Sequence, residues 1–198
     1  DARAGLRVRG YNVCHVEPAT LDPVIDSFET LGRAAGRPEA GERLAASARD
    51  RLAAVRKRVP DGPTGADTAD GIDTAAGANE SDADPRPVVY CEEWGDPPMA
   101  AGNWVPDAVA AAGGRDPFCD PGDRSREVSQ ERVEAANPDY IVIHHCGHGD
   151  RVDPDLIDDR GWDVDASITV LDDDLLNQPS PTLLDGIETL AELFHGEA

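Results

Sequence analysis

Lysine and long apolar segments are both scarce in this sequence. Lys57 is the one lysine among 198 residues, and no apolar run approaches the roughly 20 residues that a membrane-spanning helix needs. Acidic residues outnumber basic ones by 40 to 18, which gives a formal net charge of -22. This charge argues against nucleic acid and anionic lipid as partners. Many acids with a single lysine indicate a halophilic protein, whose acidic surface stays hydrated where salt screens its self-repulsion.

The sequence also lacks the motifs of common enzymes. It contains no GxSxG, no HExxH and no glycine-rich phosphate loop followed by lysine, so we expect no catalytic residues and no enzyme activity. The cysteines form no CxxC pair, which argues against a disulfide framework or a structural zinc site. They are Cys14, Cys91, Cys119 and Cys146. The chain begins with Asp1 rather than methionine, and we interpret this start as excised or truncated.

The first 59 residues are expected to be mainly helical. Residues 6–16 are predicted to be extended. Thr20 is a good helix cap, and apolar residues recur at helical spacing over residues 21–31. A long helix is predicted over residues 38–59, with one buried stripe that includes Leu44. Residues that follow this helix have a different composition.

Residues 60–87 are rich in Gly, Asp, Ala and Pro, with one isoleucine and no aromatic residue. Such a segment cannot bury enough apolar surface to offset its ordering entropy. We therefore interpret residues 60–87 as a flexible acidic insert.

The rest of the chain alternates between short apolar runs and helical patterns. Strands are predicted over residues 88–91, 140–144 and 168–171, with a loop over residues 92–102 after the first. Helices are predicted over residues 105–112, capped by Asn103, over residues 130–136, capped by Ser129, and after Ser180-Pro181. This alternation indicates an α/β fold, with a mostly parallel sheet flanked by helices on both faces.

In a parallel sheet, ligands bind beyond the carboxyl ends of the strands. This rule selects three loops: residues 92–103, 145–149 and 172–179. The first loop holds Trp94 and Met99 and leads to Trp104. Because aromatic faces stack on ring systems, this loop predicts a large flat or apolar ligand. The alternative is that both tryptophans pack in the local core.

The loop after residues 140–144 carries four potential metal ligands: His144, His145, Cys146 and His148. They would suit zinc, copper or iron, but no second cluster at metal-site spacing follows, so a hydrogen-bonding cleft loop is favoured. Glu92 and Glu93 are adjacent on a strand and point to opposite faces, so they do not easily share one site.

Four sequence blocks, in their order and spacing, resemble the cobalamin-binding proteins of bacterial and archaeal ABC importers. These proteins belong to a larger cluster that also binds siderophores and haem. The blocks are CHVEPATLDPVIDSFETLGRAAGRPEAGERL, VVYCEEWGDPPMAAGNWVPDAVAAAGG, EVSQERVEAANPDYIVIH and LNQPSPTLLDGIETL. The resemblance covers the chain from about residue 12 onward, apart from the acidic insert.

The resemblance implies the C-terminal lobe of a two-lobe, periplasmic-binding-protein-like fold. Residues 1–17 would be a remnant of the N-terminal lobe, and residues 18–59 a helical linker containing the long inter-lobe backbone helix. Residues 60–87 are the acidic insert, and residues 88–198 would form the C-terminal α/β lobe.

The resemblance further implies a monomeric, extracytoplasmic binding protein that holds a corrinoid between its lobes and delivers it to the permease and ATPase of an importer. Cobalamin would be the transported ligand and not a cofactor. The expected ligand-binding residues are Trp94, Met99, Asn103, Trp104, His145, Cys146, His148, Asp174 and Leu175. The expected permease-docking residues are Asp172, Asp173 and Asn177.

Two positions depart from the family pattern. Leu175 stands near a tryptophan position of the family, and Asn177 stands near the position of a glutamate that docks on the permease. On this interpretation Trp94 or Trp104 replaces the ring contact, and one of the aspartates at 172–174 replaces the docking charge.

Two alternatives stay open from the sequence. A ferric siderophore or haem would keep the class of protein and change the cargo. Siderophore sites usually need arginines, and the loop at 92–103 has none, whereas Arg124, Arg126 and Arg151 are near in sequence. The other alternative is a metal carrier or metalloenzyme that uses the His/Cys loop.

Overall fold

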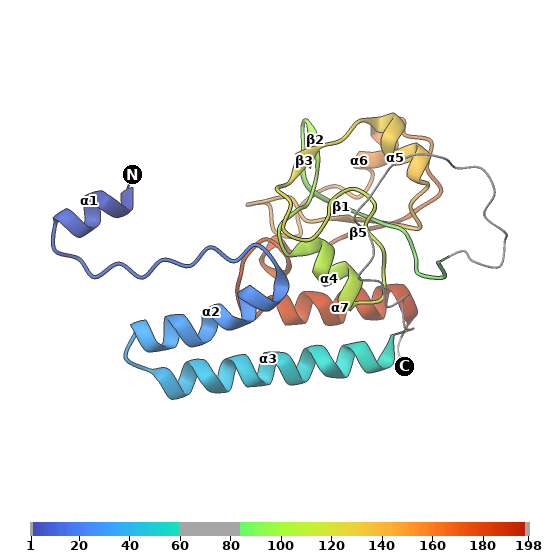
Figure 1. Ribbon diagram of the computed structural model, residues 1–198. Coiled ribbons are helices and arrows are strands. Elements are labelled where there is room, and N and C mark those ends of the chain that lie inside the picture. The colour runs from blue at the N-terminus through green and yellow to red at the C-terminus, as the bar shows by residue number, and fades with distance from the viewer. Residues whose placement is uncertain (1, 60–83, 197–198) are drawn as a thin grey trace.

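The computed structural model describes residues 2–59 and 84–196, which form a five-stranded sheet covered by helices on both faces (Figure 1). The strand order is β3-β2-β1-β4-β5. β1, β4 and β5 are parallel, while β2 and β3 add an antiparallel edge. The strands are β1 (Val89–Gly95), β2 (Pro98–Ala100), β3 (Arg126–Glu127), β4 (Tyr140–Ile143) and β5 (Ser167–Val170). The predicted α/β fold is confirmed.

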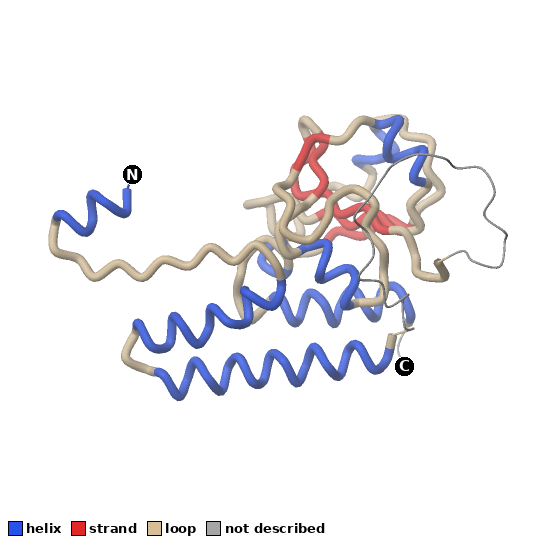
Figure 2. The backbone as a smooth tube through the Cα atoms, in the orientation of Figure 1, coloured by secondary structure: helices blue, strands red, loops and turns tan. Residues whose placement is uncertain are grey.

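Seven α-helices and one 3-10 turn lie among the described residues. They are α1 (Ala2–Val8), α2 (Leu21–Ala34), α3 (Pro38–Arg58), α4 (Val105–Ala111), α5 (Gln130–Ala136), α6 (Leu156–Asp159), η1 (Asp173–Leu175) and α7 (Leu183–His195). α2, α3 and α7 form a layer on one side of the strands, and α5 and α6 lie on the other side (Figures 1 and 2).

The two faces of β1 feed two separate cores, because successive side chains of a strand point in opposite directions. Val89 and Cys91 are fully buried in the larger core, with residues of α2, α3, α4 and α7. Tyr90 is fully buried in a smaller core on the α5 and α6 side. Glu92 faces the same side as Tyr90, to whose hydroxyl it is hydrogen bonded. One face of β1 therefore packs apolar side chains against the helices, and the other face runs from Tyr90 in the smaller core to the buried carboxylate of Glu92.

Arginines of α3 connect it to both of its neighbouring helices. Arg49 forms ion pairs with Asp26 and Glu29 of α2, at 2.6 and 3.1 Å. Arg51 donates to both carboxylate oxygens of Glu188 on α7, at 2.9 and 2.7 Å. The partly buried Arg51 pair is bidentate, which fixes the register of α3 against α7 more strictly than a single exposed contact would.

Two glycines let α2 and α3 approach each other closely. A Cβ atom placed on Gly41 would lie 2.6 Å from the carbonyl oxygen of Phe28, and one on Gly32 would lie 2.8 Å from the Cα of Gly41. Backbone therefore packs against backbone at this crossing, and a side chain has no space there.

Replacing Gly41 with alanine is expected to lower the free energy of unfolding by about 1 to 3 kcal/mol, because the added methyl group forces the two helices apart. The matched control is Gly5→Ala in α1, where a Cβ meets nothing within 4 Å. There the helix propensity of alanine should leave stability unchanged or slightly raised. Urea unfolding followed by circular dichroism measures both. Equal stability of the two variants would contradict the close packing.

Several predicted boundaries need correction. The prediction of extended structure over residues 6–16 is wrong at its start, because Leu6 to Val8 belong to α1; the segment that follows, up to Thr20, has no strand. Thr20 makes no side-chain cap, and the carboxylate of Asp107 accepts from the Leu21 amide instead, at 2.9 Å. Leu44 is 39% exposed rather than buried.

The predicted loop over residues 92–102 is in part a β-hairpin. β1 continues to Gly95 and pairs with β2, with Trp94 opposite Met99. Asn103 does not cap α4 with its side chain, because it has a positive φ of 55° and α4 begins after Trp104. Sequence patterning missed this hairpin because β2 is three residues long.

The domain boundaries stay predictions. The acidic insert falls largely on residues 60–83, which lie outside the described part of the chain. The long helix predicted at 38–59 is confirmed as α3, but within the described structure it packs mainly on α2 and α7. Its role as a helix between two lobes stays a prediction.

Candidate functional site

A cavity of about 910 Å³ lies at the carboxyl ends of β1 and β4, on the α6 side of the sheet. This is the place where open α/β sheets bind ligands. The turn between β1 and β2, the loop after β4, and the segment through α6 supply its walls. The lining residues are Trp94, Gly95, Asp96, Pro98, His145, His148, Val152, Leu156, Arg160 and Trp162. The lining combines apolar and aromatic surface with a few polar groups, as small-molecule sites do.

Glu92 forms a buried polar network beneath this cavity. Its carboxylate accepts hydrogen bonds from Arg160 at 2.7 and 3.1 Å, from Tyr90 Oη at 3.0 Å and from His145 Nε2 at 2.8 Å. Burial raises the pKa of Glu92, but the hydrogen bonds from His145 and Arg160 outweigh it, so the net direction is downward. Glu92 is therefore ionised and compensates Arg160.

Arg160 joins the β1–β2 hairpin to α6. Besides the two bonds to Glu92, its guanidinium donates to the Gly95 carbonyl oxygen at 2.6 Å and lies over the Trp162 ring, 5.0 Å from the ring centroid. Gly95 has to lack a side chain, because a Cβ there would lie 2.6 Å from His145 Cε1 and 3.0 Å from the guanidinium of Arg160. The floor of the cavity is thus preorganised by contacts between distant segments.

Trp94 stands at the rim of the cavity with a large exposed surface. The residue is 43% exposed, and its indole N–H donates to the Asp96 carbonyl at 2.9 Å, which fixes the ring within the hairpin turn. Its ring meets His148 edge to face, with centroids 6.2 Å apart. Holding so much aromatic surface in water is unfavourable, and a ligand with an apolar face would cover it.

His144 and His145 follow β4 directly and point to opposite sides. His145 lies over Glu92 in the cavity wall, whereas His144 is fully buried and bonds to Asn177, through Nδ1 to Oδ1 at 2.5 Å. The Asn177 amide returns a bond to the His144 carbonyl at 2.9 Å. Burial lowers the pKa of His144 to about 4, so the ring is neutral at physiological pH. Asn177, predicted as a docking residue, holds η1 against the end of β4.

Asp173 makes internal contacts, although it lies in a run of three aspartates. Its two carboxylate oxygens accept from the amides of Gly147 and Gly149, both at 2.8 Å. These bonds lower the pKa of Asp173. Asp172 accepts from the Asp174 amide at 3.0 Å and so caps η1. The run of three aspartates therefore orders two loops beside the cavity.

Of the nine predicted ligand-binding residues, the structure brings Trp94, His145 and His148 to the cavity wall. Trp104 packs against the larger core and donates to the Leu176 carbonyl at 2.7 Å, as the alternative interpretation expected. The others do not line this cavity: Met99 pairs in the hairpin, Asn103 turns the backbone, Leu175 packs on the larger core, and Cys146 and Asp174 are exposed. Their role in ligand binding stays a prediction.

Sequence reasoning missed Glu92, Arg160 and Trp162. It set Glu92 aside because neighbouring strand residues face opposite ways, and this same alternation sends Glu92 alone toward the cavity. Arg160 lies 68 positions from Glu92, and no local pattern connects them. Trp162 was the available signal, because it is one of only three tryptophans in the sequence.

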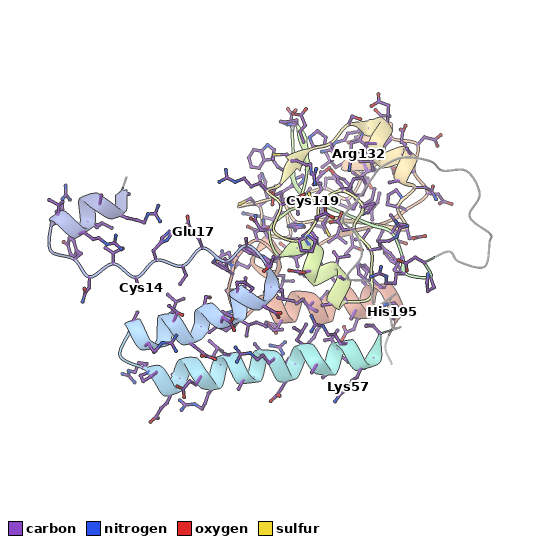
Figure 3. The ribbon with its side chains drawn as sticks, viewed as in Figure 1. Cys14, Glu17, Lys57, Cys119, Arg132 and His195 are labelled. Carbon is purple, nitrogen blue, oxygen red and sulfur yellow. The ribbon has the colours of Figure 1, made fainter. Side chains whose placement is uncertain are left out.

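The cysteines and histidines do not assemble a metal centre in the described structure. All four cysteines are free, and Cys14 lies on the segment before α2, away from Cys119 (Figure 3). Over residues 2–59 and 84–196, no three His, Cys, Asp or Glu side chains form a group that would hold a metal ion. Within the same residues, no helix combines the length and apolar character that a bilayer crossing requires.

The fold of the chain is that of periplasmic solute-binding proteins. It superposes on the periplasmic haem-binding protein RhuT from Roseiflexus sp. RS-1 with a TM-score of 0.72 and 24% identity, over 97% of this chain and 70% of that one. That likeness establishes the fold. The relatives found by sequence point to a more specific group of binding proteins.

The sequence is similar to curated cobalamin-binding proteins. It is 25% identical to the vitamin B12-binding protein of Vibrio cholerae over 196 residues, and the alignment covers 93% of this chain and 60% of the relative. It is 27% identical over 203 residues to the cobalamin-binding protein of Halobacterium salinarum, which covers 96% of this chain and 49% of the relative. The chain thus spans about half to three fifths of these relatives. No protein-family model matches it. The predicted resemblance to cobalamin-binding proteins is confirmed.

Proposed function

We propose that this chain binds cobalamin or a related corrinoid and presents it to an ABC importer. The observation that carries the proposal is the cavity at the carboxyl edge of the sheet, with Trp94 exposed at its rim and Trp162 in its wall. The names of the sequence relatives support the same cargo. Both tryptophans offer ring faces or edges to a large apolar ligand.

The cavity accepts one part of the ligand. Its volume of about 910 Å³ lies within the range of drug-sized sites, and a complete cobalamin is larger than such ligands. In the proposed complex, a side group of the corrin enters between Pro98, Leu156 and Trp162, while the flat macrocycle lies over the rim on Trp94. This arrangement covers the exposed indole and uses the apolar walls.

The charge of the cavity favours a neutral ligand over an anionic one. Arg160 is the cation among the described lining residues, and Glu92 already neutralises it through two hydrogen bonds. Asp96 adds a negative charge to the wall. An anionic siderophore or the propionates of haem would meet no uncompensated positive charge here. The second candidate, haem, is supported by the likeness to the haem-binding fold.

The importer partner belongs to the proposal as well. Asp173 is half-buried and uses both carboxylate oxygens in internal bonds, and Asn177 is half-buried and bonds to His144. Asp172 and Asp174 are exposed, and the internal bonds that they accept use one carboxylate oxygen each, so the proposed permease contact narrows to these two residues. An extracytoplasmic location and a monomeric state accompany this role. The excess of acid over base further supports a protein adapted to high salt.

Titration of the full-length protein with cyanocobalamin tests the corrinoid assignment. We expect saturable quenching of tryptophan fluorescence at micromolar ligand or below. Replacing Trp94 with alanine should weaken binding by about tenfold, because one stacked aromatic face is lost. Tyr11→Ala, which removes an exposed aromatic ring on the segment before α2, is the matched control and should bind normally.

The absence of a saturable change at micromolar cyanocobalamin would overturn the corrinoid proposal. Saturable binding of haem in a parallel titration, with no response to cyanocobalamin, would establish the second candidate in its place.

A further inference from the structure

His148 is an exposed imidazole on a loop that is nevertheless held firmly. Its own amide donates to the His145 carbonyl at 3.0 Å. The amides on either side of it, those of Gly147 and Gly149, both donate to the carboxylate of Asp173 at 2.8 Å. Three consecutive residues are thus tied down although the side chain between them faces outward. Exposed loops usually lack such fixation.

The tautomer of His148 is also fixed by its partner. Its Nδ1 lies 3.1 Å from the carbonyl oxygen of Cys146, and a carbonyl oxygen only accepts, so Nδ1 carries the proton. In the neutral ring, Nε2 then holds the free lone pair. An imidazole whose second nitrogen donates to a carbonyl is the usual arrangement of a metal-binding histidine.

Two aromatic rings orient the imidazole at the rim of the cavity. Trp94 and His145 each meet the His148 ring edge to face, with centroids 6.2 and 6.0 Å away. His145 is in turn fixed by its bond to Glu92. The His148 ring therefore stands beside the exposed indole, which is the surface on which the proposed macrocycle lies.

We propose that His148 recognises the metal of the cargo: the lone pair of Nε2 binds the corrinoid cobalt at an exchangeable axial position. This inference rests on the proposed function and deepens it, because it names the atom that distinguishes one corrinoid from another. A neutral imidazole nitrogen is a suitable ligand for a transition metal of this kind.

The step is a ligand exchange without oxidation or reduction. In aquocobalamin, a bond forms between Nε2 and Co(III), the bond between cobalt and its axial water breaks, and the water leaves with its own electron pair. Cyanocobalamin keeps its cyanide in that position, so it binds through stacking and the cavity alone. The two cargoes therefore separate metal recognition from general corrinoid binding.

Asp173 acts in this proposal as a positioning residue, and not as a docking charge. Its carboxylate reaches the ligand only through the loop, by fixing the two amides that flank His148. Binding affinity that depends on a preorganised group falls when the group has to be ordered during binding.

The experiment compares aquocobalamin with cyanocobalamin in the full-length protein and in His148→Ala, by absorption spectroscopy and equilibrium titration. In the wild type, we expect the corrin absorption bands to shift on binding aquocobalamin but not cyanocobalamin, and aquocobalamin to bind at least about tenfold more tightly. His148→Ala should abolish the shift and bring the two affinities together. His15→Ala, at an exposed histidine before α2, should keep both the shift and the preference.

Asp173→Ala should reduce the band shift while cyanocobalamin affinity stays within about threefold of the wild type. Asp173→Asn keeps one acceptor and should recover part of the shift, and Asp150→Ala, the carboxylate control on the same loop, should keep all of it. If cyanocobalamin binds and aquocobalamin gives no shift, the role of His148 is overturned while the proposed function stands. If neither corrinoid binds, both proposals are overturned. A full shift in Asp173→Ala would remove the positioning role alone.

Discussion

Replacing Glu92 with glutamine is expected to lower the free energy of unfolding by about 3 to 5 kcal/mol, because it leaves the Arg160 guanidinium inside the protein without its counter-charge. Glu92 is fully buried, and only 16% of the Arg160 side chain is exposed. A glutamine amide also presents N–H donors to the donors of Arg160 or His145, so one hydrogen bond becomes a repulsive contact.

Urea unfolding at neutral pH measures this loss, and Glu93→Gln is the matched control. Glu93 is half-buried, and burial raises its pKa, so removing its charge should change stability by less than about 1 kcal/mol. Similar losses in the two variants would show that the network does not hold the fold.

Acid should remove most of the difference between the wild type and Glu92→Gln. The folded state lowers the pKa of Glu92, so its contribution is complete above the ordinary value of about 4.3 and is lost as the pH falls through the lower folded value. Measured stabilities of the two proteins should converge below about pH 4.

Replacing Leu52 with alanine is expected to lower the free energy of unfolding by about 2 to 5 kcal/mol, because the vacated space lies in the larger core, where α3 packs with α2 and α7. Leu52 is 3% exposed. The same substitution at Leu44, eight residues earlier on α3, should cost less than about 0.5 kcal/mol, because Leu44 is 39% exposed.

The pair Leu52→Ala and Leu44→Ala tests which face of α3 is buried. Both variants lose the same atoms from the same helix, so differences in helix propensity cancel between them. Thermal and urea unfolding should rank them clearly. A loss at Leu44 as large as that at Leu52 would mean that another surface covers the outer face of α3.

The helices and the parallel strands were predictable from the sequence because their signals are local. The apolar spacing of residues 21–31 and 38–59 corresponds to α2 and α3, and the run YIVI corresponds to β4. Short edge strands carry no such signal. β2 and β3 contain three and two residues, and their pairing depends on backbone groups rather than on side-chain alternation.

The candidate site was predictable only in part. Trp94, His145 and His148 stood out because tryptophan is rare in the chain and the histidines cluster after a strand. Glu92 and Arg160 gave no signal, because a buried ion pair depends on which distant segments fold together. The aspartates at 172–174 were expected to contact the ligand or to dock on the permease, whereas Asp173 accepts hydrogen bonds from loop amides that sequence patterning cannot locate.

The alternation along β1 has a consequence for how this chain can change over time. Cys91 packs in the helical core, whereas Glu92 holds His145 and Arg160 in the cavity wall, so one position requires an apolar side chain and its neighbour a carboxylate. Inserting or deleting one residue before them would exchange their faces, placing a carboxylate among apolar helices and a thiol beneath the cavity. Related sequences can therefore vary in residue type around the cavity, but we expect the length of β1 up to Glu92 to be conserved among them. Length differences should instead collect in the turns that the strand leads into.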